Sequence, residues 1–299
     1  MALSDDYIRA WQTWHDGRVA LINAPYGPLS LISQDWLNEG EYFQSEFIPG
    51  KWMQKDGEIY YYPDEDSMAR GEFLIVDGKE ARAPTHIPHR YEAGEDAENL
   101  VPVFFNDLQV ESSYTRLNDR GEMINAIRVR DPKEAARKKI DGIEAFPLSE
   151  EWIVPARFIP GTGEVSNTQT VESTIFEASY ILGEIVATID GKDYSFEVHG
   201  HTGGSRDTGY FMNGIYIVFG DATNGKETYG GGRVIRFGSM EEVENMTQLD
   251  FNRASTFNCS VTTFMACTAA PRDSRLPFRV PAGQFAPPVP HERIQTYAG

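Results

Sequence analysis

Charged side chains that could do chemistry lie close together in one glycine-rich, strand-forming stretch, at Asp221, Glu227, Arg233, Asp250 and Arg253. An arginine can hold a carboxylate or a phosphate through two parallel hydrogen bonds. An aspartate beside it can act as an acid, a base or a hydroxyl acceptor. The same residue types also suit a structural network, because a buried charge is costly unless an opposite charge pairs with it. The sequence therefore supports two hypotheses: a binding pocket, or a set of ion pairs that locks neighbouring strands.

The pocket hypothesis rests on polar residues that stand between apolar strand segments, next to glycines that let a ligand or another backbone come close. Binding pockets are mostly apolar with a few convergent polar groups. We therefore expect a small polar or anionic molecule to bind in a β-rich pocket. Catalytic residues, cofactor, reaction and oligomeric state stay open. The expected ligand-binding residues are Asp221, Thr223, Tyr229, Arg233, Asp250, Asn252 and Arg253.

A third hypothesis is a metal site at His199 and His201, which are two apart on an expected strand and so share a face. A metal site needs three or four ligands, and the candidates for a third are His86 and His89. The two cysteines do not add a zinc motif, because no C-x-x-C occurs. We interpret them as small core residues that oxidation could cross-link.

Other familiar sites fail on spacing. The run from Asp221 has neither the fifth nor the twelfth ligand of a calcium loop. The chain also lacks a G-x-S-x-G nucleophile elbow, a P-loop and a G-x-G-x-x-G fingerprint.

Composition limits the partners. The 299 residues are 40% hydrophobic and carry a formal net charge of -18. Such an acidic chain argues against nucleic acid and anionic membranes, whose binding needs a basic patch. The sequence has no apolar run long enough to span a membrane and no signal-peptide pattern at its start. We therefore expect a cytoplasmic protein.

The pattern of short apolar runs and turn signals predicts a mainly β protein. Ser4 and two aspartates begin an amphipathic helix over residues 4–20, and a short second helix is expected over residues 132–140. Strands separated by Asp-Gly and Asn-Asp-Arg-Gly turns predict an antiparallel barrel-like or sandwich architecture. No linker is evident, so one domain over residues 1–299 is expected. Expected strands include 58–62, 73–76, 101–105, 123–129, 152–159, 173–180, 184–189, 194–198, 210–219, 233–237 and 276–280.

The stretch 215–283 resembles domain-of-unknown-function family 1684. The resemblance rests on Phe219, Asp221, Thr223, Gly225, Thr228, Tyr229, Gly230, Gly232, Arg233, Asp250, Phe251, Asn252, Ala254, Cys259, Cys267, Arg275, Leu276 and Pro277. Residues 255–258, Thr268, Ser274 and Gln284 depart from the family pattern. The resemblance implies no reaction.

Overall fold

The computed structural model describes residues 3–88, 101–112, 116–170, 174–201, 214–265 and 267–288. The chain divides into two compact units. The first contains Met1–Ile22, Ile140–Ser173 and Glu177–Gly299, and the second contains Asn23–Lys139 and Thr174–Phe176. The expectation of one domain over residues 1–299 stays a prediction.

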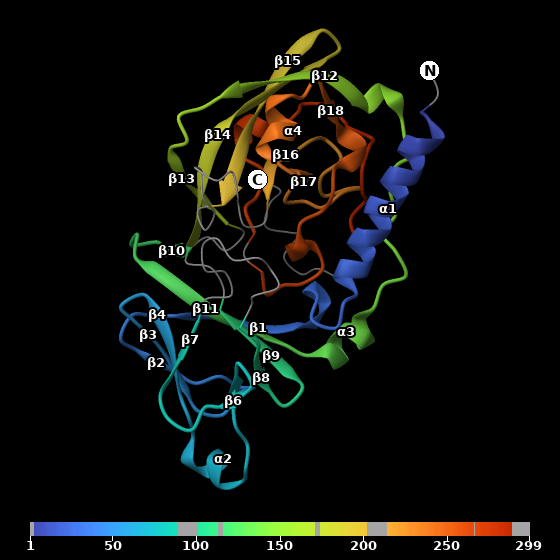
Figure 1. Ribbon diagram of the computed structural model, residues 1–299. Coiled ribbons are helices and arrows are strands. Elements are labelled where there is room, and N and C mark those ends of the chain that lie inside the picture. The colour runs from blue at the N-terminus through green and yellow to red at the C-terminus, as the bar shows by residue number, and fades with distance from the viewer. Residues whose placement is uncertain are drawn as a thin grey trace. The chain divides into compact units, whose positions relative to one another are not determined.

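The first unit is built on an antiparallel sheet (Figure 1). Its strands follow the order β17, β16, β15 and β14, and β12 and β13 also pair with β14, while β18 pairs with β12. The bounds are β12 Ile153–Pro160, β13 Val165–Gln169, β14 Ile175–Ile189, β15 Lys192–His201, β16 Ile215–Phe219, β17 Arg233–Phe237 and β18 Gln248–Asp250.

Helix α1 (Asp5–Ile22) confirms the expected N-terminal helix. Trp11, His15 and Ile22 are buried, whereas Ile8, which the periodicity places on the same apolar stripe, stays 42% exposed. The helix therefore packs through fewer residues than its pattern predicts. The unit's other helical segments are short: η3 (Glu150–Trp152), α4 (Met240–Glu244), η4 (Phe251–Arg253), η5 (Asn258–Ser260) and η6 (Arg272–Ser274).

One face of this sheet carries the core of the first unit. Alternate residues of each strand point to the same face, so Ile215, Ile217 and Phe219 of β16 face the core together with Ile235 and Phe237 of β17. Phe219 and Phe251 meet edge to face with ring centroids 5.2 Å apart. The opposite face of the same strands carries Tyr216 and Arg236 at paired positions, and these two residues belong to a polar group described below.

The second unit holds two sheets. In one, β10, β11, β9, β8, β5 and β6 follow in order and β1 pairs with β11; in the other, β2, β3, β4 and β7 follow in order. Its helical segments are η1 (Pro28–Ser30), α2 (Glu65–Ala69) and α3 (Pro132–Lys138). Its strands are β1 Leu31–Leu37, β2 Tyr42–Phe43, β3 Lys51–Lys55, β4 Glu58–Tyr62, β5 Ile75–Val76, β6 Lys79–Glu80, β7 Thr85–Ile87, β8 Val103–Phe105, β9 Leu108–Ser112, β10 Arg116–Asn118 and β11 Met123–Arg130.

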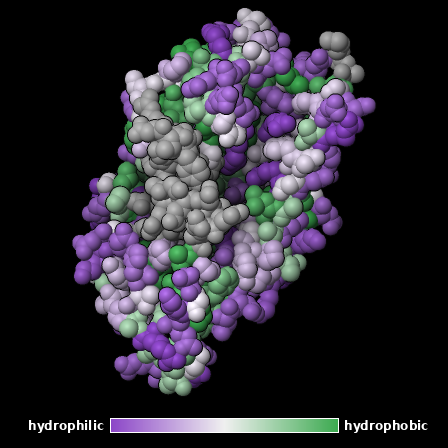
Figure 2. Space-filling model, in the orientation of Figure 1, coloured by the Kyte–Doolittle hydropathy of each residue, from purple (hydrophilic) through white to green (hydrophobic). Residues whose placement is uncertain are grey.

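The predicted fold class is confirmed: the protein is mainly β, its strand pairs are antiparallel, and its helices are few. The sheets formed by the described strands are open rather than closed, so "barrel-like or sandwich" fits the architecture only loosely. Within the described residues no helix combines the length and apolar character that crossing a membrane requires. In Figure 2 hydrophilic residues predominate on the visible face, as expected from the net charge of -18.

Three expected strands differ in the structure. The predicted pair 173–180 and 184–189 is one strand, β14, whose pairing register with β15 shifts between Ile181 and Gly183. Residues 276–280 are not a strand, although Leu276 N–H donates to the Gly220 carbonyl at 2.9 Å. The apolar pattern of this segment reflects burial, since Leu276 and Val280 belong to the core.

Candidate functional site

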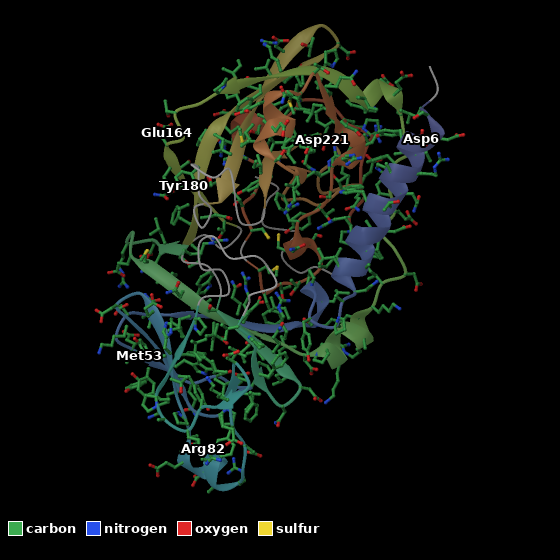
Figure 3. The ribbon with its side chains drawn as sticks, viewed as in Figure 1. Asp6, Met53, Arg82, Glu164, Tyr180 and Asp221 are labelled. Carbon is green, nitrogen blue, oxygen red and sulfur yellow. The ribbon has the colours of Figure 1, made fainter. Side chains whose placement is uncertain are left out.

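Asp221 and Arg233 form a buried ion pair at the end of a strand pair. Arg233 begins β17 and is paired with Phe219, the last residue of β16. Asp221 comes two residues after the end of β16 and lies within reach of the Arg233 side chain. Arg233 Nη2 lies 3.1 Å from Asp221 Oδ1, and both side chains have no exposed surface. Figure 3 shows Asp221 among the C-terminal segments of the chain.

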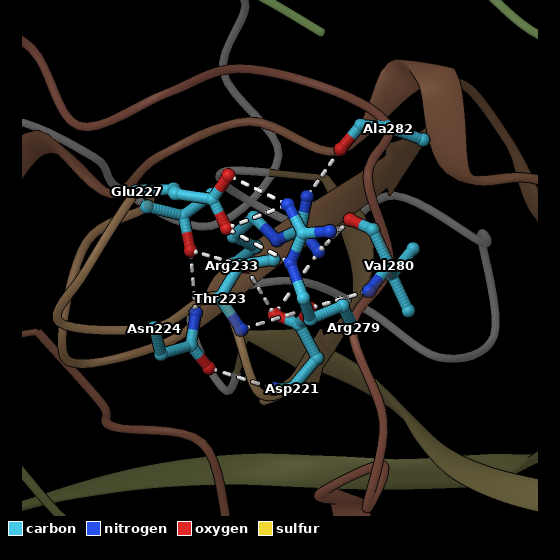
Figure 4. Close-up of polar contacts among 9 residues, drawn as sticks. Asp221, Thr223, Asn224, Glu227, Arg233, Arg279, Val280 and Ala282 are labelled. Carbon is cyan, nitrogen blue, oxygen red and sulfur yellow. Dashed lines mark hydrogen bonds and ion pairs between the residues drawn. The ribbon is translucent and has the colours of Figure 1, made fainter.

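Both partners hold the backbone of residues 280–282 (Figure 4). Asp221 Oδ2 accepts from Val280 N–H at 2.7 Å, and Oδ1 accepts from the Thr223 hydroxyl at 2.7 Å. Arg233 donates to the Val280 carbonyl at 2.9 Å and to the Ala282 carbonyl. Its guanidinium also lies over the Phe219 ring, 4.9 Å from the centroid. The pair thus connects the β16–β17 strand ends to a segment that is distant in sequence.

Burial lowers the pKa of Arg233, and the charge of Asp221 and its hydrogen bond oppose this effect. Within the described structure, the side-chain nitrogen and oxygen atoms of the pair have hydrogen-bond partners, with the exception of Arg233 Nε. Such an arrangement is typical of a structural network, because each charge compensates the desolvation of the other. Ligand binding by these two residues stays a prediction.

Asp250, Asn252 and Arg253 form a second, separate group at η4. Asp250 Oδ1 accepts from the backbone N–H of Asn252 at 3.0 Å, and Oδ2 accepts from the Tyr7 hydroxyl at 2.7 Å. Arg253 Nε is 3.8 Å from Asp250 Oδ2. Among the described contacts, no hydrogen bond or ion pair joins this group to Asp221 or Arg233.

Asn252 is fully buried and connects three segments. Its side chain donates to the Ser149 carbonyl at 2.9 Å and accepts from Ser149 N–H at 3.1 Å. Its backbone carbonyl accepts from the Trp11 indole at 2.7 Å. The segment around residue 250 therefore connects helix α1 and the segment before η3 to this part of the unit. Tyr7, through its bond to Asp250, makes a second contact from the same helix.

Tyr229 is a buried residue of the strand connection between β16 and β17. It is 2% exposed, and its hydroxyl is 3.5 Å from the sulfur of Cys259. The nearby Glu227 pairs with Arg279 at 2.7 Å on the surface (Figure 4). The described hydrogen bonds and ion pairs join Asp221, Thr223 and Arg233 in one group and Asp250, Asn252 and Arg253 in another. The binding of one ligand by the seven predicted residues stays a prediction.

A different polar group lies on the face of the sheet that is opposite to the core. Across β15, β16 and β17, His199 is paired with Tyr216, and Tyr216 with Arg236. Paired residues of antiparallel strands point to the same side, and the His199 and Tyr216 rings stack at 5.5 Å. We call this row, together with Arg18, Glu177 and Cys267, the Arg236 cluster.

Arg236 occupies a recessed position. Its side chain is exposed to solvent, yet the surrounding protein desolvates it enough to lower its pKa. Tyr216, Cys267 and Glu177 act on it electrostatically in the opposite direction. Among the residues that the structure describes, no hydrogen bond or ion pair is made by the Arg236 side chain. A guanidinium has five N–H donors, so this residue can still bind an anion.

Arg18 brings a second guanidinium from helix α1 toward the same place. Burial, with a smaller contribution from the charge of Arg236, lowers the pKa of Arg18 to about 10. Its Nη2 donates to the Thr256 carbonyl at 3.1 Å. Its Nε is buried and, like the Thr256 hydroxyl, has no hydrogen-bond partner in the described part of the chain. Two like charges that approach each other are unfavourable unless an anion joins them.

His199 occupies the middle of the row. Its Nδ1 is 3.0 Å from the Ser179 hydroxyl, and its Nε2 is 3.6 Å from Glu197. Burial lowers the pKa of His199 to about 4 although Glu177 opposes this shift, so the imidazole is neutral near pH 7. Glu177 in turn accepts from the Thr268 hydroxyl at 2.8 Å.

The metal hypothesis is not supported by a ligand set in the described residues, where no three His, Cys, Asp or Glu side chains are grouped to hold an ion. The backbone of His201 ends β15, but its side chain lies outside the described part. His86, one candidate for a third ligand, instead lies 2.7 Å from Glu58 in the second unit, and His89 lies outside the described residues. A metal at His199 and His201 stays a prediction.

Comparison with known proteins places the motif in a family. Residues 138–284 match the model of DUF1684, described as a protein of unknown function. The predicted resemblance to this family is confirmed. The comparison with curated proteins gave no match. A solution NMR structure of an uncharacterized protein of Haloarcula marismortui matches with 21% identity and a TM-score of 0.39, over 52% of this chain and 80% of that chain. We draw no conclusion about this chain from a similarity at this TM-score.

The DUF1684 segment contains all of the predicted site residues and most of the Arg236 cluster, whereas Arg18 precedes it. Arg236 is not among the residues predicted from the sequence, because those residues were selected from a stretch in which charged residues lie close together along the chain. The available signal was strand alternation: in RVIRF and IYIVF, Arg236 and Tyr216 stand between residues that face the core. Two polar residues at paired positions on the outer face of neighbouring strands indicate a polar surface patch.

A surface cavity lies elsewhere in the first unit and has a volume of about 500 Å³. It is lined at the start of β12, at the β14–β15 turn and by Phe278 and Arg279. None of the seven predicted residues lines this cavity, and Arg236 does not line it either. Acidic residues at its rim, such as Glu150 and Asp190, do not suit the anionic ligand expected from the sequence.

Proposed function

We propose that this protein binds a small anionic molecule, a carboxylate or a phosphate, at the Arg236 cluster. The observation that carries the proposal is the state of Arg236: a solvent-exposed guanidinium, recessed among protein atoms, that has no ion-pair partner in the described part of the chain. An arginine in a desolvated environment binds carboxylate and phosphate more strongly than one on an open surface, because water competes less.

Arg18 supports the proposal. Its charge and that of Arg236 repel each other, and an anion between them would turn this repulsion into two attractions. Its buried Nε has no acceptor within the described structure, and a buried donor without a partner costs about 1–3 kcal/mol. A bound anion or an ordered water molecule can accept a hydrogen bond from such a donor and remove this cost. Glu177, which is also near Arg236, disfavours a large polyanion, so the ligand is expected to be small.

The proposal is tested by calorimetric titration of the purified chain with inorganic phosphate and, separately, with succinate. Arg236→Gln removes the charge and most donors while keeping a similar size. Since a hydrogen bond to a charged group is worth about 1.5–3 kcal/mol, we expect affinity for the better anion to fall at least about tenfold. Arg157→Gln is the matched control, because Arg157 lies on β12 and is 58% exposed.

Equal affinity of wild-type protein and the Arg236→Gln variant would refute the proposal. Failure of the wild-type protein to bind either phosphate or succinate in the millimolar range would also refute it. If Arg157→Gln weakened binding as much as Arg236→Gln, the effect would be one of overall charge, and the cluster would not be the site.

A structural role of the Asp221 group is the second candidate. The observation that favours it is the complete burial of the Asp221–Arg233 pair and its bonds to the backbone of Val280 and Ala282. In this case Asp221 and Arg233 stabilise the fold of the unit, and the ligand binds at the Arg236 cluster. A cytoplasmic location and the absence of nucleic-acid and membrane partners, expected from the sequence, stay predictions.

A further inference from the structure

The cavity of about 500 Å³ lies where strand β12 leaves its neighbour β14. The two strands pair as far as Ala156 and Ala187, whereas residues 153–155 pair with β18. Strand β14 continues beyond this point to Ile189, where it pairs with β15. The strands therefore diverge at residues that line the cavity. Its volume falls in the range of small-molecule pockets, about 300–1,000 Å³.

The wall of the cavity is largely apolar and carries two aromatic rings. Buried core residues of β12 and β14 border it together with Trp152 and the half-buried Phe278. The Phe278 ring packs edge to face against Tyr194 with centroids 5.5 Å apart, and the Trp152 ring packs in the same way against Phe251 at 6.2 Å. Rings that are held in place beside a cavity can attract a cation through their negative faces.

The rim of the cavity is negatively charged. Glu151 and Asp190 are exposed and line it, and neither carboxylate has a hydrogen bond or ion pair with another described residue. Arg279 also lines the cavity, but its guanidinium is bound to the Glu227 carboxylate at 2.7 and 3.1 Å (Figure 4). The positive charge of Arg279 is therefore compensated, whereas the two carboxylates keep their charge for a ligand. The net charge of -18 also attracts a cation.

Trp152 adds one directional group. The residue is only 9% exposed, and its indole N–H makes no hydrogen bond to a described residue. The nitrogen is not among the fully enclosed atoms that lack a partner, so part of it is accessible, and the cavity is a space that Trp152 lines. An indole N–H only donates. A ligand that fits the cavity therefore offers an acceptor, such as a hydroxyl oxygen, to this donor.

We propose that the cavity binds a small hydroxylated aromatic amine. Its ammonium group lies at the rim near Glu151 and Asp190, its ring packs on Trp152 and Phe278, and its hydroxyl accepts from the indole N–H. The site differs from the Arg236 cluster in place and in charge, since no residue lines both. The inference does not rest on anion binding, and each can fail alone because the ligands and the residues are different.

The first experiment is calorimetric titration of the wild-type chain with tyramine, which carries an amine, an aromatic ring and a hydroxyl. Tyrosol is the neutral control, because it replaces the amine with a second hydroxyl on the same body. Tyramine is expected to bind at least about fivefold more tightly, the combined effect of screened ion pairs and a cation–π contact. Equal affinities for the two molecules would overturn the proposal, and so would no binding of tyramine in the millimolar range.

Variants of the rim locate the charge effect. Glu151→Gln and Asp190→Asn are each expected to weaken tyramine binding about two- to fivefold, the size of one exposed ion pair. Asp77→Asn is the matched control, because Asp77 and Asp190 both have a φ of 50° before a glycine, and asparagine tolerates this conformation. Tyrosol binding is expected to stay unchanged in all three variants. An equal loss of tyramine affinity in Asp77→Asn would show a general charge effect and overturn the assigned site.

The indole donor is tested with Trp152→Phe and a second amine, phenethylamine, which lacks the phenolic hydroxyl. The variant is expected to lose tyramine affinity several-fold and to keep most of its affinity for phenethylamine. Equal losses for both amines would refute the hydrogen bond. If the variant does not fold, the wild-type chain decides, because equal affinities for the two amines would refute the bond as well. Arg236→Gln is expected to bind tyramine like the wild-type chain, and a loss there would contradict a separate site.

Discussion

Arg233 illustrates how a residue can look functional in sequence and act structurally. Arginine beside aspartate in a glycine-rich stretch has the chemistry of an anion site. In the fold, the guanidinium is fully buried and contacts Asp221, the Val280 and Ala282 carbonyls and the Phe219 ring. No surface of this guanidinium remains for a ligand, whereas Arg236, three residues later on the opposite face, keeps its donors free within the described structure.

Removal of the Arg233 side chain is expected to destabilise the protein strongly. Arg233→Ala leaves Asp221 buried without its opposite charge, which costs about 3–5 kcal/mol. Urea unfolding followed by tryptophan fluorescence measures the loss. Arg157→Ala, at an exposed ion pair, is the control and is expected to change stability by less than about 1 kcal/mol. A loss below about 1 kcal/mol for Arg233→Ala would contradict the structural role.

Stability is expected to depend on pH through His199. Its pKa is about 4 in the folded protein, against an ordinary value of 6.5 for histidine, so the unfolded chain binds more protons between these two values. Stability is therefore fully present above pH 6.5 and falls as pH drops toward 4, by roughly 3 kcal/mol at most from this residue. Glu177 and Glu197 face the same imidazole, and their negative charge reduces the effect.

The measurement is urea unfolding of the wild-type chain and of His199→Gln across this pH range. Glutamine cannot titrate, so the variant is expected to lose less stability than the wild-type chain as the pH falls. The control is His86→Gln, because His86 is 42% exposed on its side chain. Parallel pH curves for the wild-type chain and His199→Gln would show that the imidazole does not titrate as proposed.

At the scale of elements, glycines decide where strands can meet. Gly232 precedes β17 at a φ of 107°, and a Cβ there would lie 2.7 Å from the Phe219 carbonyl oxygen. Gly232→Ala is therefore expected to lower stability by several kcal/mol, on the order of 2–4, through both strain and contact. Thermal unfolding of the purified variant checks this expectation.

Gly17 provides the opposite case in the same unit. It lies within helix α1, and a Cβ there would meet nothing within 4 Å. Gly17→Ala is expected to raise stability by about 0.5–1 kcal/mol, because alanine restricts the unfolded chain and suits a helix. If Gly232→Ala left stability unchanged or raised it, as Gly17→Ala is expected to do, the account of the β17 start would be wrong.

Local signals predicted many elements. Helix α1, strands β4 and β17 and helix α3 follow from periodicity, caps and turn residues that act within a few positions. The Asp77-Gly78 and Asp190-Gly191 turns were also predictable, since all four residues adopt the positive φ that such turns require. These features depend on neighbours in the chain, which the sequence displays directly.

The remainder depends on distant residues. Continuity of β14 through Gly183 requires space beside Ile159 and Phe158, where a Cβ would come within 2.3 Å of a carbonyl. The surroundings of the candidate residues depend on the fold for the same reason. The face of β17 on which each arginine lies follows from strand alternation, but the residues near that face come from distant parts of the chain, such as Arg18 of α1. Arg18 and Arg236 are separated by most of the chain and meet only through the fold.

At the scale of the whole molecule, charge is the dominant property. A net charge of -18 repels small anions at long range, so an anion site needs a local concentration of positive charge to oppose the overall field. The Arg236 cluster provides this by bringing two guanidiniums together, one of them desolvated to a pKa of about 10. The same self-repulsion destabilises the compact chain at low salt, because few counterions screen it.

Salt and ligand are therefore expected to stabilise the protein by separable routes. Sodium chloride is expected to raise the melting temperature of the wild-type chain and of Arg236→Gln equally, by a few degrees between roughly 0.01 and 0.1 M, as the screening length falls from about 30 Å to about 10 Å. Inorganic phosphate at matched ionic strength is expected to add a further rise only when Arg236 is present. A ligand at a hundred times its dissociation constant stabilises the folded state by about 2.7 kcal/mol. Calorimetric scans in chloride and in phosphate, with both chains, separate the general effect from the specific one. A phosphate increment that persists in Arg236→Gln would place the anion elsewhere on the chain.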